Sequence, residues 1–182
     1  MSFIKNIQEK LGRYQLKKQQ KRLQRNVKAF SLDKATTVGV LYNATNRNEA
    51  ETVKKFIQYL KEERKDVLSL GYIHSKETAD SINPVLSYTF FDTNDLSKTM
   101  VPQGNDVNSF INKPFSVLID LNLKEDCFPL EYISALSIAK FKVGANGSYR
   151  ENICDMIISV DDNPTLEYLI IQVKRYLKMI KN

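Results

Sequence analysis

The sequence predicts an α/β domain with a mainly parallel sheet, preceded by a basic helical extension. Two observations predict the domain: short β-rich runs alternate with segments of helical apolar spacing, and 182 residues are enough for one compact domain. Such regular alternation implies right-handed βαβ crossovers and a sheet covered by helices on both faces. A third observation, the concentration of positive charge in the first thirty residues, sets the extension apart. We therefore expect a basic amphipathic helical extension over residues 1–33 and a single Rossmann-like three-layer domain over residues 34–182.

The first half of the domain contains three expected strands and one expected helix. ATTVGVLYN at 35–43 is a short β-rich run, and DVLSLGYIH at 66–74 is a second. Between them, the segment 46–64 predicts a helix, because five apolar residues recur there at helical spacing: Ala50, Val53, Phe56, Ile57 and Leu60. Pro84 breaks the chain before a third strand at 86–92.

The second half of the domain continues the alternation. We expect a short helix at 106–111, a fully buried strand at 115–122, and a helix that begins at Pro129 and runs to residue 139. Short strands are expected at 141–144 and 155–160. The last helix opens at Pro164, and its broad apolar face consists of Leu166, Leu169, Ile170, Val173, Leu177 and Ile180.

The extension carries the positive charge of the whole chain. Residues 1–30 hold nine Lys or Arg against the single acid Glu9, a net charge of +8, whereas the other residues hold 18 basic and 20 acidic side chains, a net charge of −2. Placed on a helix, the segment 16–30 has a narrow apolar stripe of Leu16, Leu23, Val27 and Phe30 with its cations on the opposite side. It predicts an amphipathic helix that ends near Ser31 and Asp33.

An earlier apolar stripe is rotated by about half a turn from this one. It consists of Phe3, Ile4, Ile7, Leu11 and Tyr14. Either Gly12 breaks the helix into two pieces, or one long helix places its two halves against different partners. We expect the later stripe to pack on the domain and the earlier one to face outward.

The cationic face predicts a polyanionic partner. Like charges repel along a helix, and RNA phosphates relieve this repulsion while releasing counterions. RNA or the ribosome fits better than DNA, because no helix-turn-helix, zinc-finger or basic-zipper pattern accompanies the charge. The alternatives are a solvated helix face, an anionic membrane surface contacted through Phe3, Ile4 and Ile7, and a groove on a protein partner. The expected phosphate contacts are Arg13, Lys17, Lys18, Lys21, Arg22, Arg25 and Lys28.

A second candidate site lies where the strands end, because ligands of such sheets bind at the carboxyl ends of the strands. The residues expected there are Asn43, Thr45, His74, Asp120 and Asn122. They would serve a nucleotide- or sugar-nucleotide-binding protein or a small transferase-like enzyme. The same residue types cap helices and form turns, and neither GxGxxG nor GxxxxGK[ST] occurs. We expect no cofactor.

Metal binding, secretion and membrane insertion are not expected. His74 is the only histidine, so a site with two His ligands is impossible, and Cys127 and Cys154 match no zinc spacing and read as reduced structural thiols. The apolar runs are far shorter than the roughly 20 residues that cross a bilayer, and the N-terminus lacks a secretory pattern. We expect a cytoplasmic protein.

The segment FSVLIDLNLKEDCFPLEYISALSIAKFKVG at 115–144 carries two resemblances. Together with the basic N-terminal helix and the VGVLYNAT and LGYIHSK segments, it resembles a family of small, uncharacterised bacterial proteins, a domain of unknown function, which implies a bacterial cytosolic protein. LIDLN followed by SALSIAKFKVG is also similar to a strand-helix-strand segment in heptosyltransferase-type glycosyltransferases. Those enzymes hold a sugar nucleotide between two Rossmann-like domains, and this chain has room for one. The likeness therefore implies a similar fold, and no catalytic residue is assigned from it. Taken together, the sequence predicts a non-catalytic RNA- or ribosome-associated protein.

Overall fold

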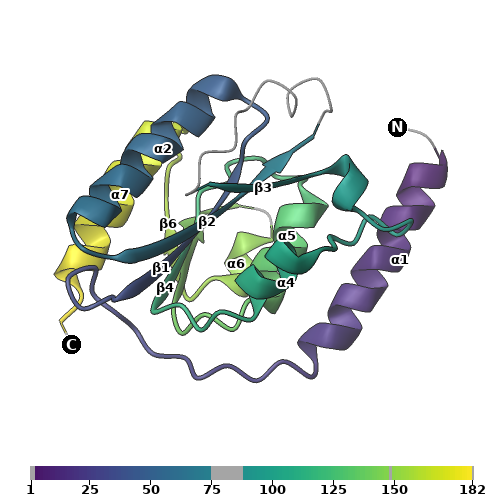
Figure 1. Ribbon diagram of the computed structural model, residues 1–182, viewed down its shortest axis with the longest axis horizontal. Coiled ribbons are helices and arrows are strands. Elements are labelled where there is room, and N and C mark those ends of the chain that lie inside the picture. The colour runs from purple at the N-terminus through teal and green to yellow at the C-terminus, as the bar shows by residue number, and fades with distance from the viewer. Residues whose placement is uncertain (1–2, 75–87, 148, 182) are drawn as a thin grey trace.

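The computed structural model describes residues 3–74, 88–147 and 149–181, which form one six-stranded sheet with helices on both faces (Figure 1). Every strand pair in this sheet is parallel, and the strand order is β3-β2-β1-β4-β5-β6. The strands are β1 (Thr37–Asn43), β2 (Asp66–Ile73), β3 (Thr89–Asp92), β4 (Val117–Asp120), β5 (Lys142–Ala145) and β6 (Met156–Ile158). The α/β class, the parallel sheet and the three-layer arrangement predicted from the sequence are confirmed.

Two helices cover each face of the sheet. The helices are α1 (Phe3–Gln20), α2 (Arg47–Glu62), α4 (Asn105–Ile111), α5 (Phe128–Leu136), α6 (Arg150–Ile153) and α7 (Leu166–Met179). A short 3-10 helix, η1 (Thr93–Asp95), follows β3. α2 and α7 pack on one face, and α4 and α5 on the other. The sequence did not predict α6 or η1, and residues 86–87 of the expected third strand lie outside the described residues.

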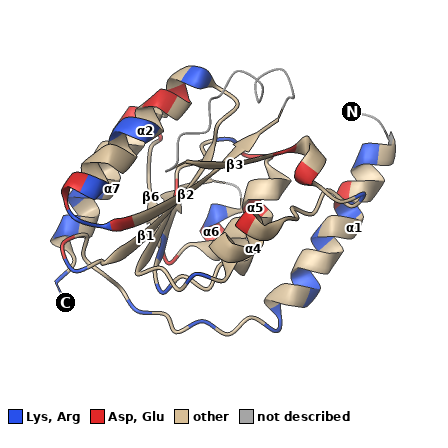
Figure 2. Ribbon diagram, viewed as in Figure 1, with Lys and Arg blue, Asp and Glu red and all other residues tan. Residues whose placement is uncertain are grey.

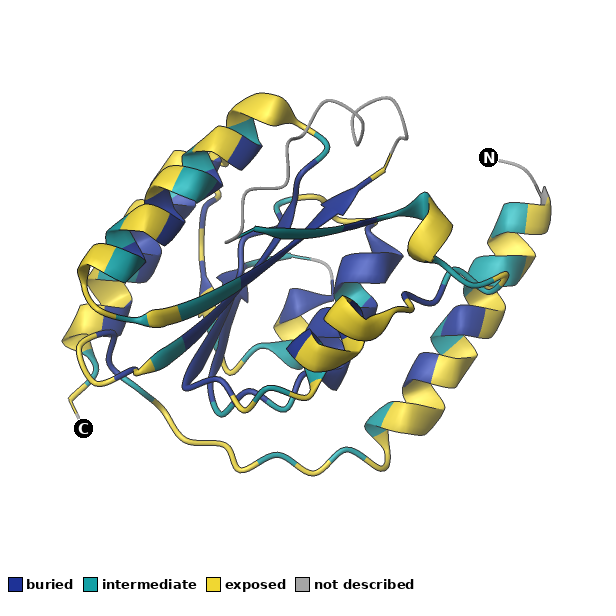
Figure 3. Cartoon of the chain, in the orientation of Figure 1, coloured by how far each residue is buried: buried dark blue, intermediate teal, exposed yellow. Residues whose placement is uncertain are grey.

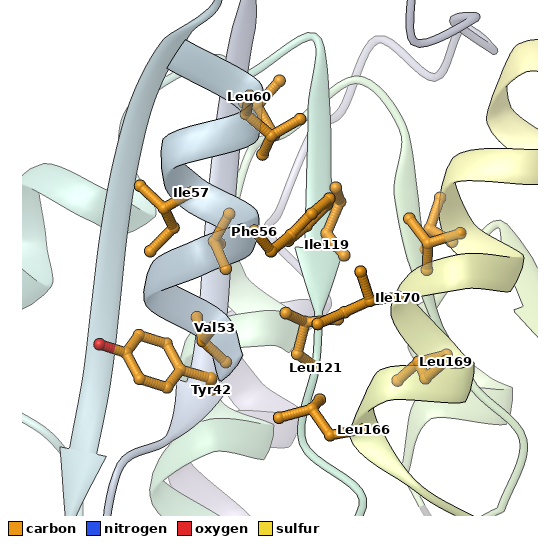
Figure 4. Close-up of a cluster of buried hydrophobic side chains, with 14 of the residues drawn as sticks. Tyr42, Val53, Phe56, Ile57, Leu60, Ile119, Leu121, Leu166, Leu169 and Ile170 are labelled. Carbon is orange, nitrogen blue, oxygen red and sulfur yellow. The ribbon is translucent and has the colours of Figure 1, made fainter. Parts of the chain in front are cut away.

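The core under α2 and α7 follows from the helical spacing of the sequence. All five apolar residues of α2 are buried, and Figure 4 shows Phe56 beside Ile119 of β4, with Leu166, Leu169 and Ile170 of α7 in the same cluster. Burying an aliphatic or aromatic side chain of this size contributes about 1.5–3 kcal/mol. On the other face, Phe110 of α4 packs on Phe115 with 5.0 Å between ring centroids. Helices therefore pack on both faces of the sheet, as is usual for a parallel sheet.

α1 adds a fourth layer outside α5 (Figure 1). Leu16, only 3% exposed, packs with Phe128, Tyr132 and Leu136 of α5 and with Val101. α1 is one helix, so Gly12 does not break it. Gly12 instead lies on the inner face, where a Cβ atom would be 2.7 Å from the Phe128 ring and closer still to the carbonyl oxygen of Thr99. A glycine is needed here because the helix backbone lies directly against α5.

The helix expected over 16–30 is wrong beyond Gln20. α1 ends there, and residues 23–31 form no regular secondary structure but cross the domain as an extended segment (Figure 1). Continuing the helix would place Arg25 one turn after Lys21, and such an i,i+4 pair of like charges destabilises a helix. The extended path instead lets the backbone N–H of Lys28 donate to the carbonyl oxygen of Lys140 at 3.0 Å. Tertiary contacts therefore overrode the helix propensity of this segment.

Candidate nucleic-acid interface

Arg13 fastens α1 to the domain. Its guanidinium donates to Glu9 within α1 and to Glu131 of α5. It also lies over the ring of Phe128, 5.1 Å from the ring centroid. Two carboxylates thus offset the charge of this guanidinium within the protein. Arg13 was predicted as a phosphate contact, and the structure shows it bound to the domain's own carboxylate.

Arg25 fastens the extended segment in the same way. Its Nη2 donates to Oδ2 of Asp155 at 2.6 Å and its Nε donates to the carbonyl oxygen of Ala139 at 3.0 Å. Oδ2 of Asp155 also accepts the backbone N–H of Lys142 at 2.7 Å, so the carboxylate links the segment to the start of β5. Arg25 is therefore a second internal anchor, 12 residues after Arg13 along the chain.

The remaining five predicted contacts point to solvent. Lys17, Lys18, Lys21, Arg22 and Lys28 are exposed, and none of them forms an ion pair within the described residues. Lys28 lies over the ring of Phe30, with its Nζ 5.5 Å from the centroid. Figure 2 shows the positive residues recurring along α1 and the extended segment. α1 and the extended segment, residues 3–31, form the N-terminal arm of the protein. Two arginines hold this arm on the domain, and its other predicted contacts face outward.

The outer face of α1 is apolar in its first half. Ile4, Ile7, Leu11 and Tyr14 are 65%, 44%, 51% and 70% exposed. Figure 3 shows exposed residues along the outer side of α1. The predicted outward direction of this stripe is therefore confirmed for these four residues, whereas the side chain of Phe3 lies outside the described part of the chain. Of the later stripe, Leu16 is buried and Phe30 packs against the core, whereas Val27 is 56% exposed. The later stripe does not act as a single packed face, because the helix that would align it ends at Gln20.

Three of the predicted strand-end residues form one linked group. Oδ1 of Asn43 accepts the backbone N–H of Thr45 at 3.0 Å, and Oγ1 of Thr45 accepts the backbone N–H of His74 at 2.9 Å. The His74 ring is exposed, with its Nδ1 3.4 Å from the hydroxyl of Tyr72. These bonds join the loops that follow β1 and β2. Nucleotide binding at this edge stays a prediction, which a thermal-shift screen with nucleotides and sugar nucleotides tests.

Asp120 and Asn122 form a separate, buried group. Both side chains reach the hydroxyl of Tyr149, which donates to Oδ2 of Asp120 at 3.1 Å and accepts from Nδ2 of Asn122 at 3.1 Å. Asp120 is 1% exposed and Asn122 is fully buried. Within the described residues, no hydrogen bond joins this group to Asn43, Thr45 or His74. The structure therefore brings the five residues together as two sets and not as one site.

Arg150 completes the buried group, and no pattern in the sequence indicates it. It is 1% exposed, and its guanidinium donates to the carbonyl oxygens of Ala145, Asn146 and Lys124. Burial raises the pKa of Asp120 above its usual value, while the charge of Arg150 and the bonds from Asn122 and Tyr149 oppose that rise. The arrangement ties the loops after β4 and β5 together.

The comparisons with known proteins place the chain in one family. The model of a family described as "Family of unknown function (DUF6913)" matches residues 8–180. The chain belongs to this family. Since the match begins inside α1 and ends beyond α7, the DUF6913 model covers most of the basic arm together with the sheet. The search of curated proteins found no match.

Three further observations on this DUF6913 chain concern metal ligands, membrane spans and the two cysteines. In residues 3–74, 88–147 and 149–181, no group of three or more His, Cys, Asp or Glu side chains could hold a metal ion. Among the described helices, none is long and apolar enough to cross a membrane. Cys127 and Cys154 are free thiols, and burial raises the pKa of Cys127 to about 11. A thiol with a pKa this high is a poor nucleophile at neutral pH.

Replacement of Asp120 by asparagine is expected to change the free energy of unfolding at pH 7 by less than about 1 kcal/mol. The amide oxygen can still accept from Tyr149 and from the backbone N–H of Asn122, and the cost of burying a charge disappears. Asp120→Ala should instead cost about 2–4 kcal/mol, because it leaves buried donors unpaired next to a cavity. Urea denaturation measures the free energy of unfolding of both variants. Asp162→Ala is the control, because Asp162 is exposed. Equal losses in the two Asp120 variants would show that the negative charge itself is required.

Proposed function

We propose that this protein associates with RNA, on its own or within a ribosome, through the free cations of its N-terminal arm. The observation that carries the proposal is the division among the arm's cations: Arg13 and Arg25 are neutralised by the domain, whereas Lys17, Lys18, Lys21 and Arg22 are exposed and unpaired within the described residues. The anchors hold the arm in one position, so the free charges form a fixed cluster. Lys28 extends this cluster along the extended segment.

A fixed cluster of like charges favours a polyanion. Four cations within six residues repel one another, and bound phosphates relieve that repulsion while releasing condensed counterions. The rest of the chain carries a net charge of −2, so the domain adds no general attraction for nucleic acid. With five phosphate contacts to a single strand, affinity should fall roughly a hundredfold between 50 and 200 mM salt.

The shape of the arm favours RNA over double-stranded DNA. Major-groove recognition of DNA needs a helix or ribbon that projects from the protein and enters the groove. α1 packs along α5, and the cations continue from α1 into the extended segment. Neither α1 nor the extended segment projects from the protein as an element that could enter a groove. A flexible strand can follow such a surface through phosphate contacts.

Reversal of three charges in Lys17→Glu, Lys18→Glu and Lys21→Glu together is expected to weaken binding of a fluorescent RNA of about 20 nucleotides by at least roughly a hundredfold at 50 mM salt. Fluorescence anisotropy measures the affinity. The matched control reverses three exposed cations outside the arm, Lys55, Arg175 and Lys181, which gives the same change in net charge. An arm variant that binds RNA as tightly as the control variant would overturn the proposal.

An anionic membrane surface is a second candidate, and the exposed apolar stripe favours it. Ile4, Ile7 and Leu11 face away from α5, and Lys10 is exposed beside them. Interfacial helices combine apolar residues that enter the headgroup region with lysines that contact anionic lipids. Vesicles of mixed neutral and anionic lipid are therefore the second probe in the same experiment. Sedimentation with these vesicles that Ile7→Asp abolishes, in the absence of RNA binding, would favour the membrane.

A further inference from the structure

We propose that Tyr14, Lys17, Lys18 and Lys21 form a site for an unpaired nucleotide, in which a base stacks on the Tyr14 ring and phosphates contact the lysines. This inference rests on the proposed RNA function and adds to it a substrate class, single-stranded RNA. It also gives a role to Tyr14, an aromatic side chain that phosphate contacts alone would not require.

The spacing of the four residues places them on one side of the arm. Positions i, i+3, i+4 and i+7 are neighbours on a helix surface, and Lys21 follows directly after the last residue of α1. Together with Gln20 they line a hollow that is open to solvent, so a base can reach the Tyr14 ring from outside.

Tyr14 has the properties of a stacking platform. Its side chain is 70% exposed, and it forms no hydrogen bond, ion pair or ring contact within the part of the chain that the structure describes. Every nucleobase has a π-face that can stack on such a ring, whatever its identity. Gln20 lies at the same hollow, and its amide can donate to and accept from the edge of a base.

The arrangement favours an unpaired base over a duplex. In a double helix the faces of the bases are covered by their neighbours, and an aromatic side chain on a flat surface cannot reach them. Single strands, loops and bulges present bases that can turn outward and stack. The lysines contact phosphates in both forms, so Tyr14 should affect only the single-stranded form.

The test compares a single-stranded RNA of about 12 nucleotides with a duplex of the same length, by fluorescence anisotropy at 50 mM salt. Tyr14→Leu is expected to weaken binding of the single strand about tenfold and to leave the duplex affinity and both salt slopes unchanged. Tyr14→Phe keeps the ring and should restore wild-type affinity. Tyr176→Leu replaces another exposed tyrosine, on α7, and should have no effect.

The results separate this inference from the proposed function. If RNA binds but Tyr14→Leu weakens the duplex and the single strand equally, or weakens neither, the nucleotide site is overturned and the RNA function stands. If Tyr14→Phe is as weak as Tyr14→Leu, the phenol hydroxyl acts and stacking is overturned. If neither RNA binds and reversal of the lysines has no effect, the proposed function itself fails.

Discussion

Replacement of Gly12 by valine is expected to release α1 from α5 while the sheet and its helices stay folded. A side chain at this position would overlap the Phe128 ring and the carbonyl oxygen of Thr99, and a backbone oxygen cannot move aside as a flexible side chain can. Release would expose Leu16 and the α5 surface that it covers, at a cost of about 2–5 kcal/mol to the docked state.

Amide hydrogen exchange measures this prediction residue by residue. In Gly12→Val the amides of residues 3–20 should exchange much faster, whereas those of β1 and β4 keep their protection. Asn6→Val is the control, because it adds the same β-branched side chain to an exposed position of α1. Unchanged protection of α1 in Gly12→Val would mean that α5 can shift to accept the new side chain. The variant also tests whether RNA binding needs a docked arm, since it leaves every cation in place.

The sequence predicted the elements of the sheet well because each carries its own local signal. The five apolar residues of α2 recur at helical spacing, and all five are buried against the sheet. Similarly, Asp120 and Asn122 are two residues apart, and strand geometry predicts that they point to the same side. The structure shows both of them bonded to Tyr149. That partner lies 27 residues beyond Asn122, and no local pattern indicates it.

The arm was harder to predict because its structure depends on distant partners. Residues 16–30 are rich in good helix formers, yet the segment beyond Gln20 is extended and bonded to Ala139, Lys140 and Asp155. In the sequence, Arg13 and Arg25 look the same as the other five cations. Only the folded chain brings Glu131 and Asp155 beside them, 118 and 130 residues away. A charge pattern therefore predicted the candidate interface but could not separate its anchors from its free cations.

The difference in unfolding free energy between wild type and Lys142→Met is expected to change with pH between about 7 and 9. Lys142 is 1% exposed, and its Nζ donates to the carbonyl oxygens of Ser134 and Ala135 at the end of α5. Burial, together with the nearby charge of Arg25, lowers the pKa of Lys142 to about 7, although Cys154, Asp155 and Asp120 oppose the shift.

The sign follows from the two protonation states. Above pH 7 the native Lys142 loses its proton, whereas the unfolded lysine keeps it until about pH 10.4. The unfolded chain therefore binds more protons, and wild-type stability gains up to about 1.4 kcal/mol per pH unit from this group as the pH rises. Below pH 7 both states are protonated, and the contribution no longer changes. Methionine keeps the length of the side chain without a titrating group, so the variant lacks this slope.

Urea denaturation of wild type and Lys142→Met at pH 7, 8 and 9 measures the difference in their unfolding free energies. The titration of groups that the two proteins share cancels in this difference. Lys55→Met is the matched control, because Lys55 is exposed on α2 and its removal should leave the pH dependence of wild type intact. A wild-type curve parallel to that of Lys142→Met would mean that Lys142 stays charged in the folded protein. In that case, the carbonyl oxygens of α5 and the carboxylate of Asp155 would stabilise the ammonium group enough to offset its burial.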